Sequence, residues 1–249
     1  MTHSAPPWRA HVPGGLALAA MLLVSPPLRA QSSGDGFLFR RPQGSLSIWL
    51  GYERPFVNSP IFRFVTDTFT LSKGSFGAFA IGGDLSFRVA PRMELMFSGG
   101  WAGSRAQSRY RNGQAAFQTT TLERVPLTAS LKLYVAPPGE SVGRFAWVPS
   151  RVAPFVGAGG GLMWYRFQQY GDFIDYADSS VQPDQLSSDR WTGELHAFAG
   201  LDVALGSRYL LTGRAQYTWA RSRLGSDFVG PNSVDLSGLS VTAGLGVRF

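Results

Sequence analysis

The sequence predicts an all-β protein, an eight-stranded antiparallel up-and-down transmembrane β-barrel. Three observations support this fold class: apolar residues alternate with polar or small ones, the connections alternate between short and long, and aromatic residues gather at the ends of the expected strands. The composition agrees with an ordered β-protein, because 30 of the 249 residues are Gly, 13% are aromatic and only 16% are charged. Disordered chains instead combine few aromatic residues with high charge.

The C-terminal segment 239–249 shows the alternation most clearly. One face carries Leu239, Val241, Ala243, Leu245, Val247 and Phe249, and the other carries Ser240, Thr242, Gly244, Gly246 and Arg248. Successive side chains of a strand point to opposite faces, so this pattern indicates a strand with one apolar and one polar face. The same alternation recurs in the segments 45–52, 79–89, 93–101, 124–135, 191–205 and 209–219.

The eighth expected strand is the segment 154–168, where many Gly residues leave few side chains to mark a face. We expect Phe155, Tyr165 and Phe167 to point outward, and Arg166 and Gln168 to point inward. The chain then has eight expected strands of about 7 to 15 residues.

The connections between these strands alternate in length. Short connections at 90–92 and 206–208 alternate with long ones at 53–75, 103–116, 170–190 and 221–234. Short turns at one end and long loops at the other are typical of an outer-membrane barrel. The connection 137–154 is the exception, because it is long at the end where short turns are expected. A soluble sandwich shows no such asymmetry, and a soluble lipocalin-like barrel would turn its apolar residues inward.

Aromatic residues of the apolar parity are expected at both ends of the strands. The group at the long-loop end is Tyr52, Phe79, Trp101, Trp191, Tyr217 and Trp219, and the group at the other end is Phe87, Phe155, Tyr209 and Phe249. Aromatic rings favour the interface between lipid and water, so these two groups predict the two girdles of a membrane barrel. Packing in a core would place aromatic residues in mid-strand as readily as at the ends.

The N-terminus has the pattern of an export signal. Arg9 and His11 precede an apolar run, and Ala30 follows as a small residue at a cleavage position. The run is shorter than the roughly 20 apolar residues that a spanning helix needs. We therefore expect residues 1–30 to be a cleaved signal peptide, 31–42 a short periplasmic segment and 43–249 the barrel, located in the outer membrane.

Charged and polar residues of the inward parity are expected to line a narrow lumen. They are Asp84, Arg88, Glu94, Arg124, Lys132, Arg166, Glu194, His196, Asp202, Arg214 and Arg248. An eight-stranded barrel is only wide enough for side chains to fill it, and enclosed charges must pair. A network of ion pairs that closes the lumen is the first interpretation. A narrow path for a small solute is the second, and its ligand is not identified.

Catalytic, metal and cofactor sites are not expected. The absence of Cys excludes thiolate ligands and a Cys nucleophile. His196 is the only histidine after the expected cleavage site; Glu194 shares its face, but Phe198 occupies the next inward position and the sequence shows no neighbouring nucleophile. A lone histidine is also a poor metal site, which needs three or four ligands. Scattered arginines do not form the basic cluster of a nucleic-acid-binding protein.

The chain resembles the outer-membrane-protein-W-like and related families of small bacterial barrels. The resemblance rests on the terminal Phe249 after alternating apolar residues and on the stretches 125–134 and 154–161, which look like strands four and five of those barrels. It implies the outer membrane of a Gram-negative cell, recognition of Phe249 by the barrel assembly machinery, and a role with small hydrophobic solutes. Outer-membrane lipid and lipopolysaccharide are the expected surroundings, and the arginines of 103–116 suit lipopolysaccharide phosphates. A lipid-modifying enzyme and a soluble periplasmic binder are the alternatives.

Overall fold

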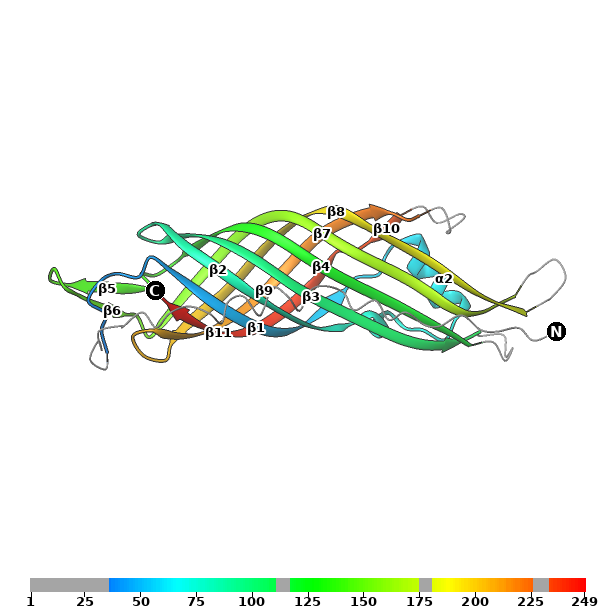
Figure 1. Cartoon of the computed structure of the whole chain (residues 1–249), viewed down its shortest axis with the longest axis horizontal. Coiled ribbons are helices and arrows are strands. Elements are labelled where there is room, and N and C mark those ends of the chain that lie inside the picture. Colours follow the sequence, from blue (N-terminus) through cyan, green and yellow to red (C-terminus); the bar gives the residue numbers. More distant parts are fainter. Residues whose placement is uncertain (1–35, 111–116, 175–180, 226–232) are drawn as a thin grey trace, which may run out of the picture. The chain divides into compact units, whose positions relative to one another are not determined.

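The computed structural model confirms the predicted barrel (Figure 1). It describes residues 36–110, 117–174, 181–225 and 233–249, so the expected signal peptide lies outside the described residues. The strands of the ring are β1 (Gly44–Pro55), β2 (Ala78–Ala90), β3 (Met93–Arg109), β4 (Phe117–Tyr134), β7 (Val152–Ile174), β8 (Val181–Ala204), β9 (Tyr209–Arg223) and β11 (Gly238–Arg248).

Each strand of the ring pairs antiparallel with its neighbours in chain order. The ring closes where β1 pairs with β11, from Ser45 opposite Arg248 to Pro55 opposite Gly238. Closure of this kind satisfies the backbone groups that an open sheet edge would expose, which is a requirement within a membrane.

Five short elements lie between strands of the ring. The helix α2 (Pro60–Thr68) and the 3-10 helix η3 (Lys73–Phe76) lie between β1 and β2, and β10 (Ser233–Asp235) pairs with the end of β9. The strands β5 (Gly139–Val142) and β6 (Ala146–Pro149) form a separate hairpin, and Leu38 of the segment before β1 pairs with Trp147 of β6. Among the described residues, no helix is long and apolar enough to cross a membrane.

The two ends of the barrel differ, and we name them by what they carry. The terminal end holds the start of β1, the end of β11, the two tight turns and the β5–β6 hairpin. This hairpin is the long connection 137–154, which the sequence also placed at the end with the short turns. The loop end holds the long connections. One expected loop, 170–190, is instead mostly strand, because β7 and β8 stay paired from Val152 opposite Val203 to Ile174 opposite Val181. The predicted upper length of about 15 residues is therefore wrong for several strands, since ladder pairing continues beyond the part with an apolar face.

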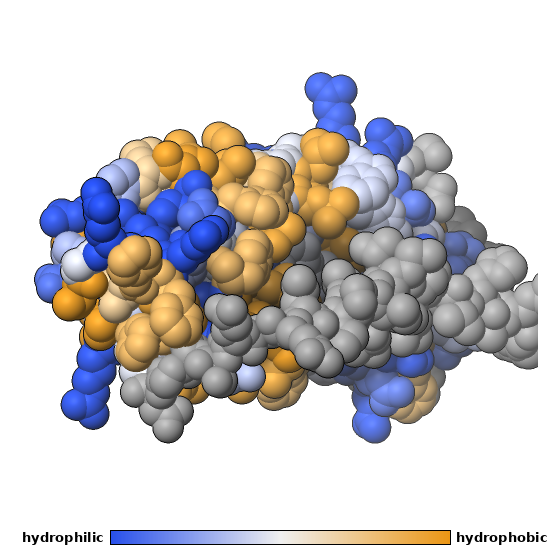
Figure 2. Space-filling view, turned by 60° about the vertical axis from the view of Figure 1, so that its left-hand side comes forward, coloured by the Kyte–Doolittle hydropathy of each residue, from blue (hydrophilic) through white to orange (hydrophobic). Residues whose placement is uncertain are grey.

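The outer wall of the ring is apolar, as the alternation predicted. Its exposed side chains include Leu46, Ile48, Leu50, Ile81, Phe97, Leu127, Leu131, Leu162, Leu195, Leu201, Val241 and Leu245. Figure 2 shows apolar residues over much of this face, next to hydrophilic residues at the end that carries β5 and β6. A soluble protein rarely exposes so large a continuous apolar surface, so the wall fits a lipid environment.

The aromatic residues expected in the girdles lie on the outer wall, with one exception. Tyr52, Phe79, Trp101, Trp191 and Trp219 are exposed toward the loop end, Tyr217 is half-buried beside Trp219, and Phe87, Tyr209 and Phe249 are exposed toward the terminal end. Phe155 is the exception, because it is buried inside the barrel.

The expected orientation of β7 is wrong. Phe155, Tyr165 and Phe167 are buried in the lumen, whereas Arg166 points outward with 42% of its side chain exposed and pairs with Glu123. The reason is the environment at the loop end. There the outer face of β7 meets water and carries polar residues, while the inner face meets an apolar plug.

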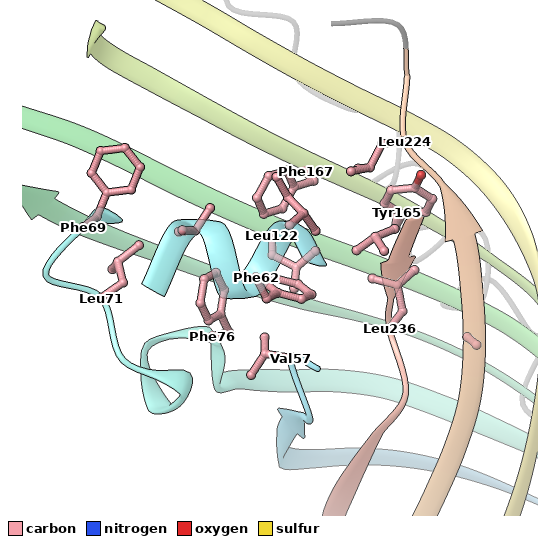
Figure 3. Packing of buried hydrophobic residues seen from close by; sticks show 14 of the residues in the cluster. Val57, Phe62, Phe69, Leu71, Phe76, Leu122, Tyr165, Phe167, Leu224 and Leu236 are labelled. Atoms are coloured by element: carbon pink, nitrogen blue, oxygen red, sulfur yellow. The ribbon is translucent and has the colours of Figure 1, made fainter. Parts of the chain in front are cut away.

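This apolar plug fills the loop end of the lumen (Figure 3). Pro60 occupies the first turn of α2, a position that proline favours, and Ile61, Phe62 and Val65 form the buried face of that helix. The Phe62 ring packs edge-on against Phe76 at 4.9 Å and Phe167 at 5.8 Å between ring centroids. The remaining members include Val57, Phe69, Leu71, Leu122, Tyr165, Leu224, Val234 and Leu236. The connection that was expected to be a loop therefore closes the barrel.

Candidate functional site

The terminal end of the lumen holds a dense polar network around Asp202. Lys132 Nζ donates to Asp202 Oδ2 at 2.6 Å, and the Tyr134 hydroxyl donates to the same oxygen at 2.7 Å. Thr212 Oγ1 donates to Asp202 Oδ1 at 2.8 Å, so both carboxylate oxygens have partners. Tyr134 also lies 3.2 Å from Glu94. A buried charge that is paired and hydrogen-bonded in this way is stable, and it blocks the lumen.

Aromatic rings form the next layer toward the centre. Phe155 and Phe198 lie 6.1 Å apart between ring centroids, and Lys132 Nζ lies 4.1 Å from the Phe155 centroid. The Phe198 ring lies on Gly157, where a Cβ atom would come within 2.3 Å of Phe198 Cζ. Gly157 therefore makes room for the Phe198 ring, a role that the sequence alone did not indicate.

The central layer contains two ion pairs that bring together residues from distant strands. Arg214 Nη1 lies 3.2 Å from Asp84 Oδ2, and Trp49 Nε1 donates to Asp84 Oδ1 at 3.0 Å. Arg124 Nη1 donates to Glu53 Oε1 at 2.8 Å. Each arginine is thus matched with one carboxylate. The partner of Arg124 lies at a position that the sequence placed in a loop.

The third group of the central layer is Ser130, His196 and Glu194. Ser130 Oγ lies 2.7 Å from His196 Nε2, and His196 Nδ1 lies 3.5 Å from Glu194 Oε1. Glu194 and His196 occupy alternate positions of β8, and Ser130 comes from β4, on the other side of Gly159 of β7. Neither oxygen of Glu194 accepts a hydrogen bond from a described residue, although only 1% of its side chain is exposed.

This group has the order of a hydrolase triad. A triad needs an accessible nucleophile and donors for an oxyanion. Ser130 and His196 are both buried, and neither lines the central cavity described below. Ser130 lies in the middle of the ladders of β4 with β3 and β7, so the backbone donors beside it belong to the sheet.

Ten of the eleven residues expected to line the lumen lie inside the barrel or at its terminal end. They are Asp84, Arg88, Glu94, Arg124, Lys132, Glu194, His196, Asp202, Arg214 and Arg248. Arg166 does not, as the orientation of β7 shows. Arg248 is half-buried and lies over the Trp147 ring at 5.7 Å from its centroid. Sequence reasoning missed Glu53, Trp49, Ser130 and Tyr134. Trp49, Ser130 and Tyr134 have the inward parity, but they are not charged, and their place in the lumen network follows only from their hydrogen bonds in the structure.

Two hollows adjoin the central layer. A cavity of about 50 Å³ lies inside the barrel, and its lining includes Trp49, Glu53, Glu194 and Arg214. A wider groove of about 660 Å³ lies at the loop end, and we call it the wall groove. It is lined by Phe56, Asn58, Gly193, Glu194, Leu195, Tyr217, Trp219, Ala220, Arg221, Asp235 and Ser237.

The wall groove lies where β8 and β9 stop pairing. The ladder between them ends at Glu194 opposite Ala220. Beyond that point a hydrogen bond from Thr192 Oγ1 to the Arg221 carbonyl at 2.6 Å, and one from Gly225 N to Ser188 Oγ at 2.9 Å, span the two strands. Aromatic rings line one side of the groove, with Tyr217 at 4.3 Å from Trp219 and 5.5 Å from Phe56 between centroids.

Within the described part of the chain, no group of three or more His, Cys, Asp or Glu residues could hold a metal ion. The polar groups of the lumen are mostly committed to one another. The hollows open to a ligand include the apolar and aromatic wall groove, the small polar cavity behind it, and a third hollow of about 680 Å³ on the outer wall, lined by residues that include Phe97, Leu127 and Trp191.

A closed ring of eight antiparallel strands, apolar outside and charged inside, defines a transmembrane β-barrel of the small bacterial outer-membrane type. No protein-family model matches the chain, and no curated protein matches it. Among solved structures, it is similar to the outer membrane protein OprG from Pseudomonas aeruginosa, with 16% identity, a TM-score of 0.44, and coverage of 85% of this chain and 99% of that one. It is also similar to Neisserial surface protein A (NspA), with 15% identity, a TM-score of 0.40, and coverage of 87% and 100%. The N-terminal β-barrel domain of Pseudomonas aeruginosa OprF matches at 14% identity and a TM-score of 0.36, with coverage of 84% and 100%.

Proposed function

We propose that this protein is a non-enzymatic outer-membrane barrel that captures a small hydrophobic solute in its wall groove and provides no open channel. The terminal end then faces the periplasm and the loop end faces the outside. The apolar wall between two sets of exposed aromatic residues supports this placement, because such a surface fits a lipid core with an interface on each side.

The filling of the lumen argues against passage along the barrel axis. The network around Asp202 occupies the terminal end, ion pairs occupy the centre, and the apolar plug occupies the loop end. The cavity between them, of about 50 Å³, has room for only a few water molecules. We expect no single-channel conductance when the full chain is reconstituted in planar bilayers, and steady open steps would contradict a closed lumen.

The wall groove is the single observation that carries the solute proposal. Its volume of about 660 Å³ lies within the range of small-molecule sites. Phe56, Tyr217 and Trp219 offer ring surface to an apolar body, and Arg221 at the rim offers a charge to a polar head. Because Asp235 and Glu194 line the groove together with Arg221, an amphipathic molecule with one apolar chain and a small polar head suits this arrangement best.

Photo-crosslinking tests this proposal. The full chain in lipid nanodiscs would be irradiated with a diazirine fatty acid, and the modified residues would be mapped by mass spectrometry. We expect crosslinks at Leu195 and Tyr217 that an unlabelled fatty acid displaces and that Trp219→Ala abolishes. Trp101→Ala is the matched control, because Trp101 is equally exposed on β3 outside the groove. Crosslinks spread evenly over the apolar wall would mean that the fatty acid only dissolves in the surrounding lipid.

The group of Ser130, His196 and Glu194 is the one observation that favours an enzyme instead. A functional triad would react with a fluorophosphonate at the serine hydroxyl. Because Ser130 is buried, we expect no labelling of the folded barrel. Labelling that disappears in Ser130→Ala would establish a hydrolase and would contradict the non-enzymatic proposal.

Lipopolysaccharide is the proposed partner of the outer surface. Arg105 and Arg109 are exposed on β3 beyond Trp101, toward the loop end. Their guanidinium groups can bind phosphate in a bidentate manner just above the aromatic residues. A double variant Arg105→Gln, Arg109→Gln should co-purify with less lipopolysaccharide than the parent barrel, whereas Arg144→Gln in the β5–β6 hairpin should not change the amount.

A further inference from the structure

The central layer contains three carboxylates but only two arginines, so one carboxylate has no guanidinium partner. Besides Glu194, this layer holds five charged or titratable side chains: Glu53 from β1, Asp84 from β2, Arg124 from β4, His196 from β8 and Arg214 from β9. Arg124 is matched with Glu53, and Arg214 is matched with Asp84. Glu194 is the carboxylate that remains.

His196 does not donate a hydrogen bond to the carboxylate of Glu194. Its Nε2 atom is committed to Ser130, and its Nδ1 atom lies 3.5 Å from Glu194 Oε1 without forming a hydrogen bond. The second oxygen, Oε2, has no donor among the described residues. An isolated buried carboxylate is strongly disfavoured, so this position calls for a compensating group.

Space for that group lies next to Glu194. Glu194 lines the cavity of about 50 Å³, and so does the second carboxylate, Glu53. The lining also includes Arg214, which is paired with Asp84, and neutral oxygen atoms such as the hydroxyls of Ser98, Thr128 and Thr218. The Ser98 hydroxyl is also buried without a hydrogen-bond partner.

From this geometry we infer that the cavity beside Glu194 binds one small monovalent cation, such as Na⁺ or K⁺. Carboxylate and hydroxyl oxygens are the ligands that hard cations prefer. A single carboxylate without a guanidinium partner matches one monovalent ion. The described residues also lack the three-carboxylate or histidine cluster of a divalent site. Glu194 lines both the cavity and the wall groove, so the groove is the route by which the ion enters.

The cation binds the folded barrel and has no site in the unfolded chain, so it must raise stability by mass action. The test is urea unfolding of the full chain in detergent micelles, with NaCl or KCl compared with choline chloride at equal ionic strength. At equal ionic strength, choline chloride screens surface charges as much as NaCl or KCl does, but the choline ion is too large for the cavity. We expect the unfolding midpoint to rise with sodium concentration in a saturable way and to stay constant with choline. Equal midpoints in sodium and choline salts would overturn the proposal.

Glu194→Gln keeps the shape of the side chain and removes its charge. We expect this variant to lose most of the sodium-dependent shift and to be at least as stable as the parent in choline chloride, because the uncompensated charge is gone. Glu123→Gln is the control, since Glu123 pairs with Arg166 outside the lumen, and it should keep the full shift. A full shift in Glu194→Gln would overturn the proposal.

A direct measurement keeps the test decisive if Glu194→Gln does not fold. The ²³Na resonance of a sodium solution should broaden when the parent barrel is added, and K⁺ should reverse the broadening by competition. Choline should not reverse it. No broadening, or broadening that choline reverses equally, would overturn the proposal. None of these readouts depends on capture of a solute in the wall groove.

Discussion

Arg124 and Glu53 form an ion pair of 2.8 Å across the lumen, with 1% and 14% of their side chains exposed. Glu53 is near the end of β1, just before the chain turns into the apolar plug, and Arg124 is in β4. The pair therefore lies on the side of the central layer that faces the apolar plug, and it joins strands that are not neighbours in the ring.

Removing the carboxylate of this pair should be costly. Glu53→Ala leaves a buried guanidinium without its counter-ion, so we expect a loss of about 3–5 kcal/mol in the free energy of unfolding. Urea unfolding in micelles measures the change. Glu123→Ala removes the acid of the exposed pair with Arg166 and should cost less than about 1 kcal/mol. Similar losses in the two variants would show that the Arg124 pair is hydrated.

A second prediction concerns Gly157. A Cβ atom there would lie 2.3 Å from Phe198 Cζ and 2.6 Å from the Leu131 carbonyl oxygen, so Gly157→Ala must displace the ring or the strand. Overpacking of this kind costs about 1–3 kcal/mol. Gly193→Ala, on the neighbouring strand, is the control, because a Cβ atom at Gly193 would have no atom within 4 Å. An unfolding midpoint unchanged by Gly157→Ala would disprove the packing role of this glycine.

The sequence was sufficient to predict the barrel because alternation assigns faces over most strands. It failed in β7 for a physical reason. Gly157 and the glycines after it have no side chain that could mark a face, and Tyr165 and Phe167 lie beyond the lipid-facing wall. There an apolar residue lies inward against the plug, so the rule that apolar residues point outward is reversed.

The partners within the lumen could not be predicted from the sequence. Parity tells which face of the sheet a side chain lies on, but it gives neither the position of the side chain along the barrel axis nor its position around the ring. Glu53 and Arg124 are 71 residues apart, and Ser130 and His196 are 66 residues apart. Which charges meet depends on the stagger of all the strands between them. The helix α2 was missed for a related reason. Its apolar face is buried only when it packs against the inner wall of the closed barrel.

A third prediction tests lipid contact. Ile48 lies midway along β1 on the outer wall and is 72% exposed. Ile48→Arg should lower the free energy of folding into vesicles by about 2–4 kcal/mol, the penalty for arginine at the bilayer midplane. Val142→Arg, at the end of β5 outside the ring, should have little effect. If both variants fold into vesicles equally well, the wall does not contact lipid.

The last prediction concerns Phe249, whose backbone closes the ring. Phe249 N donates to the Gly44 carbonyl at 3.1 Å, and its own carbonyl accepts from Gln43 N at 2.7 Å. Phe249 is 54% exposed, and its phenyl ring packs edge-on against that of Phe87, with 6.3 Å between the ring centroids. The residue therefore has two separable roles, which are strand pairing through its backbone and an exposed aromatic side chain available for recognition.

Two variants separate these roles. If the assembly machinery recognises the side chain, Phe249→Ala should reduce the heat-modifiable protein in the outer-membrane fraction several-fold, yet refold normally in detergent without that machinery. Deletion of Phe249 also removes the pairing with Gly44, so it should impair refolding in detergent as well. Phe145→Ala is the matched control, because Phe145 is 76% exposed next to β6 and outside the ring, and it should assemble normally. Equal assembly of Phe249→Ala and Phe145→Ala in cells would show that the terminal aromatic ring is not an assembly signal.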